Sequence, residues 1–280
     1  MRLILLKSLF ICWLAFSLAG CESLKNFSFN KDSETEDEYK DWNVEKFRKE
    51  AQTAVDAGNY EKAVKLYEAL EARYPFGETS AQTQLDVAYA YYKSGDADAA
   101  LAAADRFIKI NPRNPSVDYA YYLKGLVNYN RGFGFVDRFL PTDTSQRDIS
   151  TAKEAYENFS ELVKRFPNSK YAPDAKQRMI ALRNNMAMHE VHIARYYIKR
   201  KAYVAAVNRA STVIEKYQRT PAVPFALEVL KEAYTKLDMP DKANNIERIY
   251  QMNYPSGAPV PEHSEATFSH KVWDFIGLEK

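Results

Sequence analysis

The fold of this chain is decided by the stretch Gly58–Pro75, which reads GNYEKAVKLYEALEARYP. Ala63 lies five residues after the glycine, Tyr67 follows four residues later and Leu70 three residues after that. Small and apolar residues at this spacing share one face of a helix. Glycine readily takes the left-handed backbone that ends a preceding helix, and proline stops the helix that it follows. The stretch therefore predicts the turn and second helix of a helix-turn-helix unit.

The same pattern returns along the chain, first 37 residues later. The further copies are Gly95, Ala100, Ala104, Phe107 and Pro112; Ala155, Phe159, Leu162 and Pro167; Lys201, Ala206, Ala210, Val213 and Gln218; and Asp238, Ala243, Glu247, Tyr250 and Pro255. A helix-turn-helix unit of roughly 34 residues with this spacing is the tetratricopeptide (TPR) signature. One unit cannot bury its apolar face alone, so neighbours must stack. The sequence predicts an all-α solenoid of about five TPR repeats.

The third repeat carries an insert at about 133–149, because 23 residues separate Gly132 from Ala155 where five are expected. The insert contains Phe133, Phe135 and Phe139. Long inserts in repeat proteins tend to be functional or disordered, and three phenylalanines argue against simple disorder. Two interpretations remain open: contact with a partner, or a loop packed back on the solenoid.

A long helix is expected over Ala172–Lys199, with Pro173 in its first turn and neither glycine nor proline after it. At 1.5 Å per residue it would be near 40 Å long. It would join repeats one to three (44–167) to repeats four and five, the whole second part spanning 168–255. The array would then form two modules with separate partners.

The N-terminus reads as a lipoprotein signal. Arg2 and Lys7 precede an uncharged run that ends in Leu18-Ala19-Gly20-Cys21. Such a run is too short to span a bilayer comfortably, and small residues before a cysteine form the bacterial lipobox. We expect residues 1–20 to be removed and Cys21 to be acylated.

The residue after the cysteine is Glu22 and not the aspartate that retains lipoproteins in the inner membrane. This predicts an outer-membrane protein that faces the periplasm of a Gram-negative bacterium. Residues 21–43 are polar and acidic, which is typical of a flexible tether.

The composition of the chain argues against several classes of function. Loss of Arg2 and Lys7 takes the formal charge of +2 to about zero, so the mature chain lacks the basic footprint that nucleic acid requires. Cys12 lies in the signal, which leaves one cysteine and no disulfide framework. His189-Glu190-Val191-His192 is not a zinc-protease motif, and no nucleophile or phosphate-loop motif appears. We expect no metal, no cofactor and no enzymatic activity.

The first helices of repeats two and three predict a binding surface. Their inward positions carry five tyrosines, with Lys93 and Lys124 close by, and the tyrosines are Tyr89, Tyr92, Tyr119, Tyr122 and Tyr129. Aromatic walls with cationic edges would suit an extended peptide that ends in an aromatic residue and a carboxylate. The alternative is that the tyrosines fill space between stacked helices.

Repeat four predicts a different surface, which is basic and comprises Arg195, Lys199, Arg200, Lys201 and Arg209. It would either dock an acidic partner or be simply solvated.

Several stretches resemble the BamD (ComL-type) family of outer-membrane assembly lipoproteins. They are Arg73-Tyr74-Pro75-Phe76-Gly77, Gln84-Leu85-Asp86, Ala88–Lys93, Asp105–Ile108, Asn111-Pro112, Asp118-Tyr119, Pro167-Asn168-Ser169 and Val204–Arg209. The resemblance implies a scaffold that helps fold and insert β-barrel proteins in the outer membrane. It implies that the C-terminal repeats contact the BamA-type barrel subunit and that the N-terminal repeats receive the C-terminal signals of substrates and contact other accessory lipoproteins. By motif, Arg73, Tyr74 and Phe76 belong to substrate recognition, and Asn208 and Arg209 belong to the C-terminal module.

Three other functions are weaker: a TPR lipoprotein of peptidoglycan or division, a DNA-uptake protein and an envelope hydrolase. The tail, 256–280, has no counterpart in the resemblance. It is first proline-rich and then amphipathic over Phe268–Leu278. It could dock on the fold, on a partner or on lipid.

Overall fold

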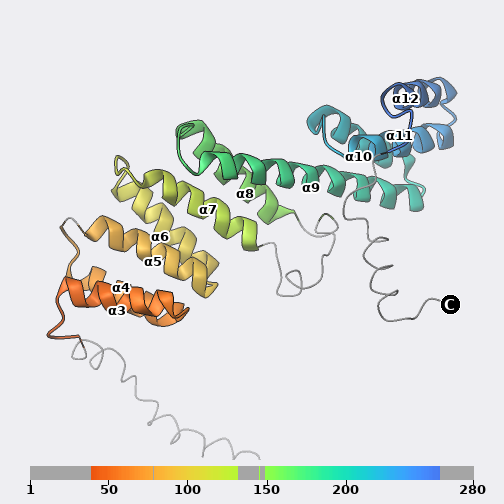
Figure 1. The fold of residues 1–280 in the computed structure, drawn as a ribbon. Helices are drawn as coiled ribbons and strands as arrows, with labels where there is room; N and C mark the ends of the chain where they lie inside the picture. The colour runs from red at the N-terminus through yellow and green to blue at the C-terminus, as the bar shows by residue number, and fades with distance from the viewer. Residues whose placement is uncertain (1–38, 78, 132–144, 146–148, 259–280) are drawn as a thin grey trace, which may run out of the picture. The chain divides into compact units, whose positions relative to one another are not determined.

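The computed structural model describes residues 39–77, 79–131, 145 and 149–258. Every long regular element in these ranges is an α-helix (Figure 1), which confirms the predicted fold class. The helices are α3 (Val44–Asp56), α4 (Tyr60–Arg73), α5 (Ser80–Ser94), α6 (Ala97–Ile110), α7 (Val117–Arg131), α8 (Ser150–Arg165), α9 (Ala172–Lys199), α10 (Tyr203–Lys216), α11 (Val223–Lys236) and α12 (Pro240–Asn253).

From α4 onward each helix packs against the next one in the chain. The alanines of the repeat pattern let these helices approach closely, and those of the first four repeats are fully buried. The residue seven positions after each alanine, here called the wedge position, lies between helices. Its first four occupants are at most 2% exposed: Leu70, Phe107, Leu162 and Val213. Full burial of one such side chain stabilises the fold by about 1.5–3 kcal/mol.

The turn between the two helices of a repeat uses a left-handed residue. Gly58 has φ 73° and Gly95 has φ 91°, while Lys201 (φ 61°) and Asp238 (φ 57°) take the same place in repeats four and five. Glycine adopts this conformation without strain, whereas a side chain makes it cost about 1–2 kcal/mol. Repeats four and five therefore keep the left-handed turn although they have no glycine there.

Helix α9 has the predicted bounds and belongs to two cores. Leu182, in its first half, packs in a core with residues of α5, α6, α7 and α8. Val191 and Ala194, in its second half, pack in a core with α10 and α11. Because one unbroken helix serves both cores, the described residues from Phe47 onward form one compact unit. The boundary between compact units falls between Lys46 and Phe47. The division into two modules near residue 168 stays a prediction.

Several expectations concern residues outside the described ranges: the signal 1–20, Cys21, most of the tether and the tail from residue 259. The last residues of the tether are described, and there the ring of Trp42 lies 4.9 Å from that of Tyr39 and 4.4 Å from Lys46 Nζ. Among the described helices, none has the length and apolar character that a membrane crossing needs.

Two residues of the insert are described, and both are buried. Ser145 is 3% exposed and Ile149 is 5% exposed. The carbonyl oxygen of Ser145 lies 2.7 Å from Nδ1 of His189 on α9. At these two points the insert packs on the solenoid, as one of the two interpretations requires.

Candidate binding surfaces

The five tyrosines of the predicted binding surface do not line one common hollow. Tyr89 of α5 and Tyr119 of α7 line a hollow of about 540 Å³. Tyr92 accepts a hydrogen bond from Asn130, and its ring centroid lies 6.4 Å from that of Tyr89. Tyr122 and Tyr129 contact α8 and α9 instead.

The hollow, here called the N-terminal hollow, is walled by α3, α4, α5, the start of α7 and the residue before α9. Its lining residues are Gln52, Val55, Asp56, Tyr67, Gln82, Leu85, Asp86, Tyr89, Ser116, Tyr119 and Tyr171. Aromatic rings and polar groups therefore share one concave surface. Two carboxylates are among them, and no lysine or arginine is.

Asp86 is one of the two carboxylates in this hollow, and it is partly buried. Burial raises the pKa of the Asp86 carboxyl, although a 2.7 Å hydrogen bond from Gln82 and the charge of Arg48 counteract it. Burial, with Asp86 nearby, also raises the pKa of Tyr67 to about 12. A buried carboxylate is stabilised by an added donor or positive charge and is opposed by a second anion. The hollow therefore favours N–H groups and cations over a carboxylate.

The cationic edge predicted from the sequence is wrong for both lysines. Lys93 Nζ lies 5.3 Å from the ring centroid of Tyr60, at the start of α4. Lys124 Nζ lies 2.6 Å from Asp105 of α6. Neither lysine lines the N-terminal hollow, because Lys93 lies beside Tyr60 at the start of α4 and Lys124 pairs with Asp105 of α6.

A polar cluster joins α7 to α9. Tyr122 donates a 2.7 Å hydrogen bond to Asp174 and stacks on Tyr171 with ring centroids 4.7 Å apart. Arg178 Nε donates to the same carboxylate oxygen at 2.6 Å, and its guanidinium lies 4.8 Å from the Tyr129 ring. Burial opposes ionisation of Asp174, but the bonds from Arg178 and Tyr122 outweigh it and hold the pKa of Asp174 below its usual range. For Tyr122 and Tyr129 the geometry fits helix packing.

Arg73, Tyr74 and Phe76 lie at the end of α4 and just beyond it. Tyr74 caps the helix by donating its backbone N–H to Leu70. Phe76 is 89% exposed, which makes it the most exposed large apolar side chain in the described part of the chain. These three residues form a surface separate from the N-terminal hollow.

The predicted partner-binding residues of repeat four fall into two groups, and the first group contacts neighbouring helices. Arg209 pairs at 3.1 Å with Glu190 of α9, a carboxylate that is only 8% exposed. Arg195 lies 5.3 Å from the Phe225 ring of α11. Two of the predicted partner-binding residues are therefore held by the fold.

The other two are turned to solvent. Arg200 is exposed in the turn after α9, and Asn208 is exposed on α10. Of the four predicted partner-binding residues, these two are exposed and have no ion pair in the described part of the structure.

Sequence reasoning missed four residues: Asp56, Asp86 and Tyr171 around the N-terminal hollow, and Glu190 beneath Arg209. Asp86 stood within a quoted motif, but nothing in its spacing showed that it would be buried. In the described ranges, no group of three or more His, Cys, Asp or Glu side chains could hold a metal ion.

Stacked helix pairs with this turn and spacing define the class of protein, a TPR solenoid. The chain belongs to the YfiO family of outer membrane lipoproteins, whose model matches residues 40–249. It is 45% identical over 249 residues to the outer membrane protein assembly factor BamD of Neisseria meningitidis serogroup B, covering 89% of this chain and 91% of the relative. It is 38% identical to the protein of the same name from Vibrio cholerae, covering 73% and 85%.

Among solved structures, that of the MamA protein aligns with 78% of this chain and 98% of its own, at 16% identity and a TM-score of 0.30. The TPR assignment rests on the helices and turns of the chain itself.

Proposed function

We propose that this chain acts in outer-membrane protein assembly as a scaffold that binds an extended segment of its substrate in the N-terminal hollow. Relatives that share 38–45% of their residues over most of their length carry the name of assembly factor, which supports the general role. The observation that carries the specific role is the hollow itself, with Tyr89 and Tyr119 on its walls.

The charge of the hollow decides which part of a substrate enters. An aromatic side chain would contact the tyrosine rings, and backbone N–H groups would donate to Asp86 and Asp56. A terminal carboxylate would stay outside, because two carboxylates already line the hollow. An aromatic-ended peptide should therefore bind at least as tightly with an amidated C-terminus as with a free one.

Peptide affinity tests this site. Tyr89→Ala should weaken binding of an amidated, aromatic-ended barrel-protein peptide about tenfold, as the loss of one aromatic contact implies. Tyr91→Ala is the matched control, since Tyr91 is on the same helix but hydrogen-bonds Glu68 of α4 away from the hollow. Equal affinity in both variants would exclude the hollow as the substrate site.

We propose that the exposed part of repeat four contacts the BamA-type barrel subunit, and that other accessory lipoproteins join the same complex. Charge reversal Arg200→Glu should reduce capture of that subunit from detergent-solubilised outer membranes while peptide affinity stays unchanged. If peptide affinity falls as well, the two surfaces are not independent.

We further propose that acyl chains on Cys21 hold the protein on the periplasmic face of the outer membrane and that it acts by binding, without catalysis. The family description supports the anchor. Cys21→Ser should remove the protein from the outer-membrane fraction, and its persistence there would contradict the anchor.

A further inference from the structure

The described array ends with α12, and this leaves the last wedge position open. In repeats one to four the wedge residue is covered when the next helix packs: α5 on α4, α7 on α6, α9 on α8 and α11 on α10. Tyr250 occupies the wedge position of repeat five and remains half-exposed. Within the described residues, no helix follows α12 to cover it. The surface against which a sixth repeat would pack is thus uncovered.

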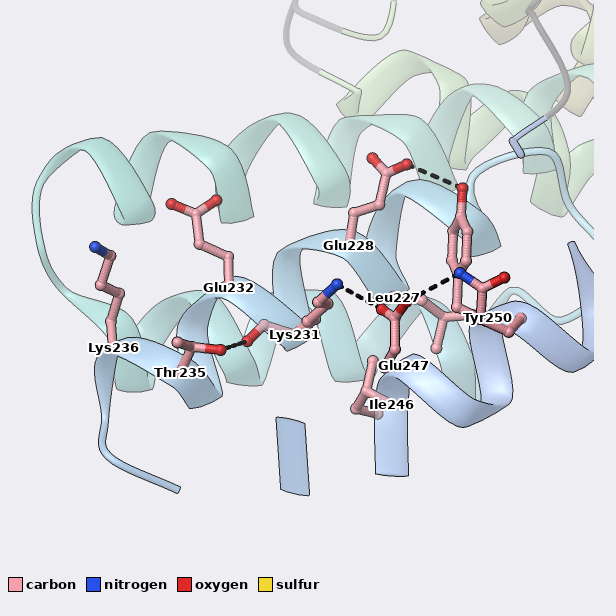
Figure 2. Close-up of a pocket in the computed structure, with 10 residues that line it drawn as sticks. Leu227, Glu228, Lys231, Glu232, Thr235, Lys236, Ile246, Glu247 and Tyr250 are labelled. Atoms are coloured by element: carbon pink, nitrogen blue, oxygen red, sulfur yellow. Dashed lines mark hydrogen bonds and ion pairs between the residues drawn. The ribbon is translucent and has the colours of Figure 1, made fainter. Parts of the chain in front are cut away.

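That surface is hollowed. A cavity of about 450 Å³ lies between α11 and α12 (Figure 2), here called the C-terminal hollow. Leu227, Ile246 and the ring of Tyr250 supply its apolar part. Leu227 is only 4% exposed, so the apolar part continues into the core.

The rim of the C-terminal hollow is charged and internally paired. Lys231 Nζ lies 2.6 Å from Glu247, and Tyr250 donates to Glu228 at 3.2 Å, as Figure 2 shows. Glu232 and Lys236 add one charge of each sign to the rim, which therefore suits an occupant with an apolar face and polar flanks of both signs.

The chain itself leads into this hollow. Beyond α12, Gly257 has φ 88° and donates its N–H to Tyr254 in a turn. After that turn the backbone of Ala258 lies near the Tyr250 hydroxyl, and its influence works against the rise in the pKa of Tyr250 that burial causes. The last described residue therefore lies near Tyr250, which lines the hollow, and residues 259–280 continue from there.

Those residues have the composition and length to fill it. Phe268, Val272, Phe275 and Ile276 follow the spacing i, i+4, i+7, i+8, which aligns them on one face of a helix. Ser269, His270, Lys271 and Asp274 are polar and fall between them. The nine residues before Phe268 can span about 30 Å, whereas α11 with its 14 residues is about 21 Å long. The segment can thus reach any point of the hollow.

We propose that residues 268–278 form an amphipathic helix that folds back into the C-terminal hollow and takes the place of the first helix of a sixth repeat. Solenoids require a cap because their last repeat otherwise leaves apolar surface in water. Attachment at Ala258 gives the segment a high effective concentration over the hollow, which favours it over a second copy of the chain.

Hydrogen–deuterium exchange on the full mature chain tests the proposal. The variant Phe268→Asp/Phe275→Asp should speed exchange of the α12 amides at least tenfold, because the cap is lost. The matched control Ser269→Asp/Lys271→Asp changes the polar face and should leave α12 unchanged. The altered residues lie outside the described helices, so exchange in α5 and α7 should stay constant and report an intact solenoid.

If a second copy of the chain fills the hollow, or if the tail binds lipid instead, the exchange experiment gives a different result. Protection of α12 that rises with protein concentration would mean that a second copy fills the hollow, and protection that needs phospholipid vesicles would mean that the tail binds lipid. Either result, or identical α12 exchange in wild type and the Phe268→Asp/Phe275→Asp variant, would overturn the proposal.

Tryptophan fluorescence gives a second readout. With Trp42→Phe, Trp273 is the one tryptophan left in the mature chain, because Trp13 lies in the signal. Docking should slow acrylamide quenching of Trp273 severalfold compared with the Phe268→Asp/Phe275→Asp version. Equal quenching would mean that the segment stays in water.

Discussion

Gly125 of α7 faces the ring of Phe159 on α8 so closely that a Cβ on the glycine would lie 2.4 Å from Cε1 of the phenylalanine. Phe159 occupies the position that alanine holds in repeats two and four, as Ala104 and Ala210. The glycine therefore makes room for a large ring that is itself fully buried. In this repeat, a large residue on one helix packs against a glycine on the other.

Gly125→Ala should destabilise the protein by about 1–3 kcal/mol, since the added methyl group overfills a packed core. Urea unfolding measures this effect. The double variant Gly125→Ala/Phe159→Leu should lose less stability than the sum of the two single variants. Simple additivity would show that the ring and the glycine are not coupled.

Lys201→Gly should stabilise the protein by about 1 kcal/mol, because Lys201 is held at φ 61° without a glycine's freedom. Thermal unfolding measures the gain as a higher Tm. The reverse change at the equivalent turn, Gly95→Ala, is the control and should lower stability by a similar amount. No gain in the Lys201→Gly variant would mean that the lysine side chain offsets its backbone strain.

Asp174 should make stability depend on pH at the acidic end. Its pKa is lower in the folded chain than in the unfolded chain, so the folded state binds fewer protons there. The contribution is complete above the unfolded value of about 4 and is lost as pH falls through the folded value.

Urea unfolding between pH 3 and 6 measures how the free energy of unfolding depends on Asp174. Asp174→Asn should remove about 0.5–1 kcal/mol at pH 6, a modest amount because the side chain is 43% exposed, and should flatten the acid slope. Asp98→Asn, which alters the 82% exposed partner of Arg131, is the control and should leave the slope nearly as in wild type. An unchanged slope in the Asp174→Asn variant would contradict the assignment.

Arg209→Ala should destabilise the fold by about 1–3 kcal/mol, because it leaves the buried carboxylate of Glu190 without its cation. Adding Glu190→Gln should restore much of that loss, since a neutral amide needs no counter-charge. Chemical denaturation of Arg209→Ala and of Arg209→Ala/Glu190→Gln measures the loss of stability and its recovery. A partner-binding defect in Arg209→Ala alone would therefore mix stability with recognition, which makes Arg200 the better probe.

Local periodicity by itself determined the repeat architecture and the bounds of the long helix. Ala63, Ala100 and their equivalents report helix contact directly, because only a small residue allows two backbones to approach at that spacing. Pro173 at the first turn and the absence of later breakers likewise predicted α9 over 172–199. Such signals need only neighbours in the chain.

The binding surfaces depended on contacts between distant residues, and tertiary structure alone decided them. Helical spacing placed five tyrosines on one face, but Asp174, 52 positions beyond Tyr122, holds that tyrosine against α9. The pKa of Asp86 in the N-terminal hollow is raised because packing of the helices partly buries its carboxyl group, and Lys124 turned away because Asp105 lies on the facing helix. Burial and pairing set the strength of every charge, and both arise only when remote segments meet.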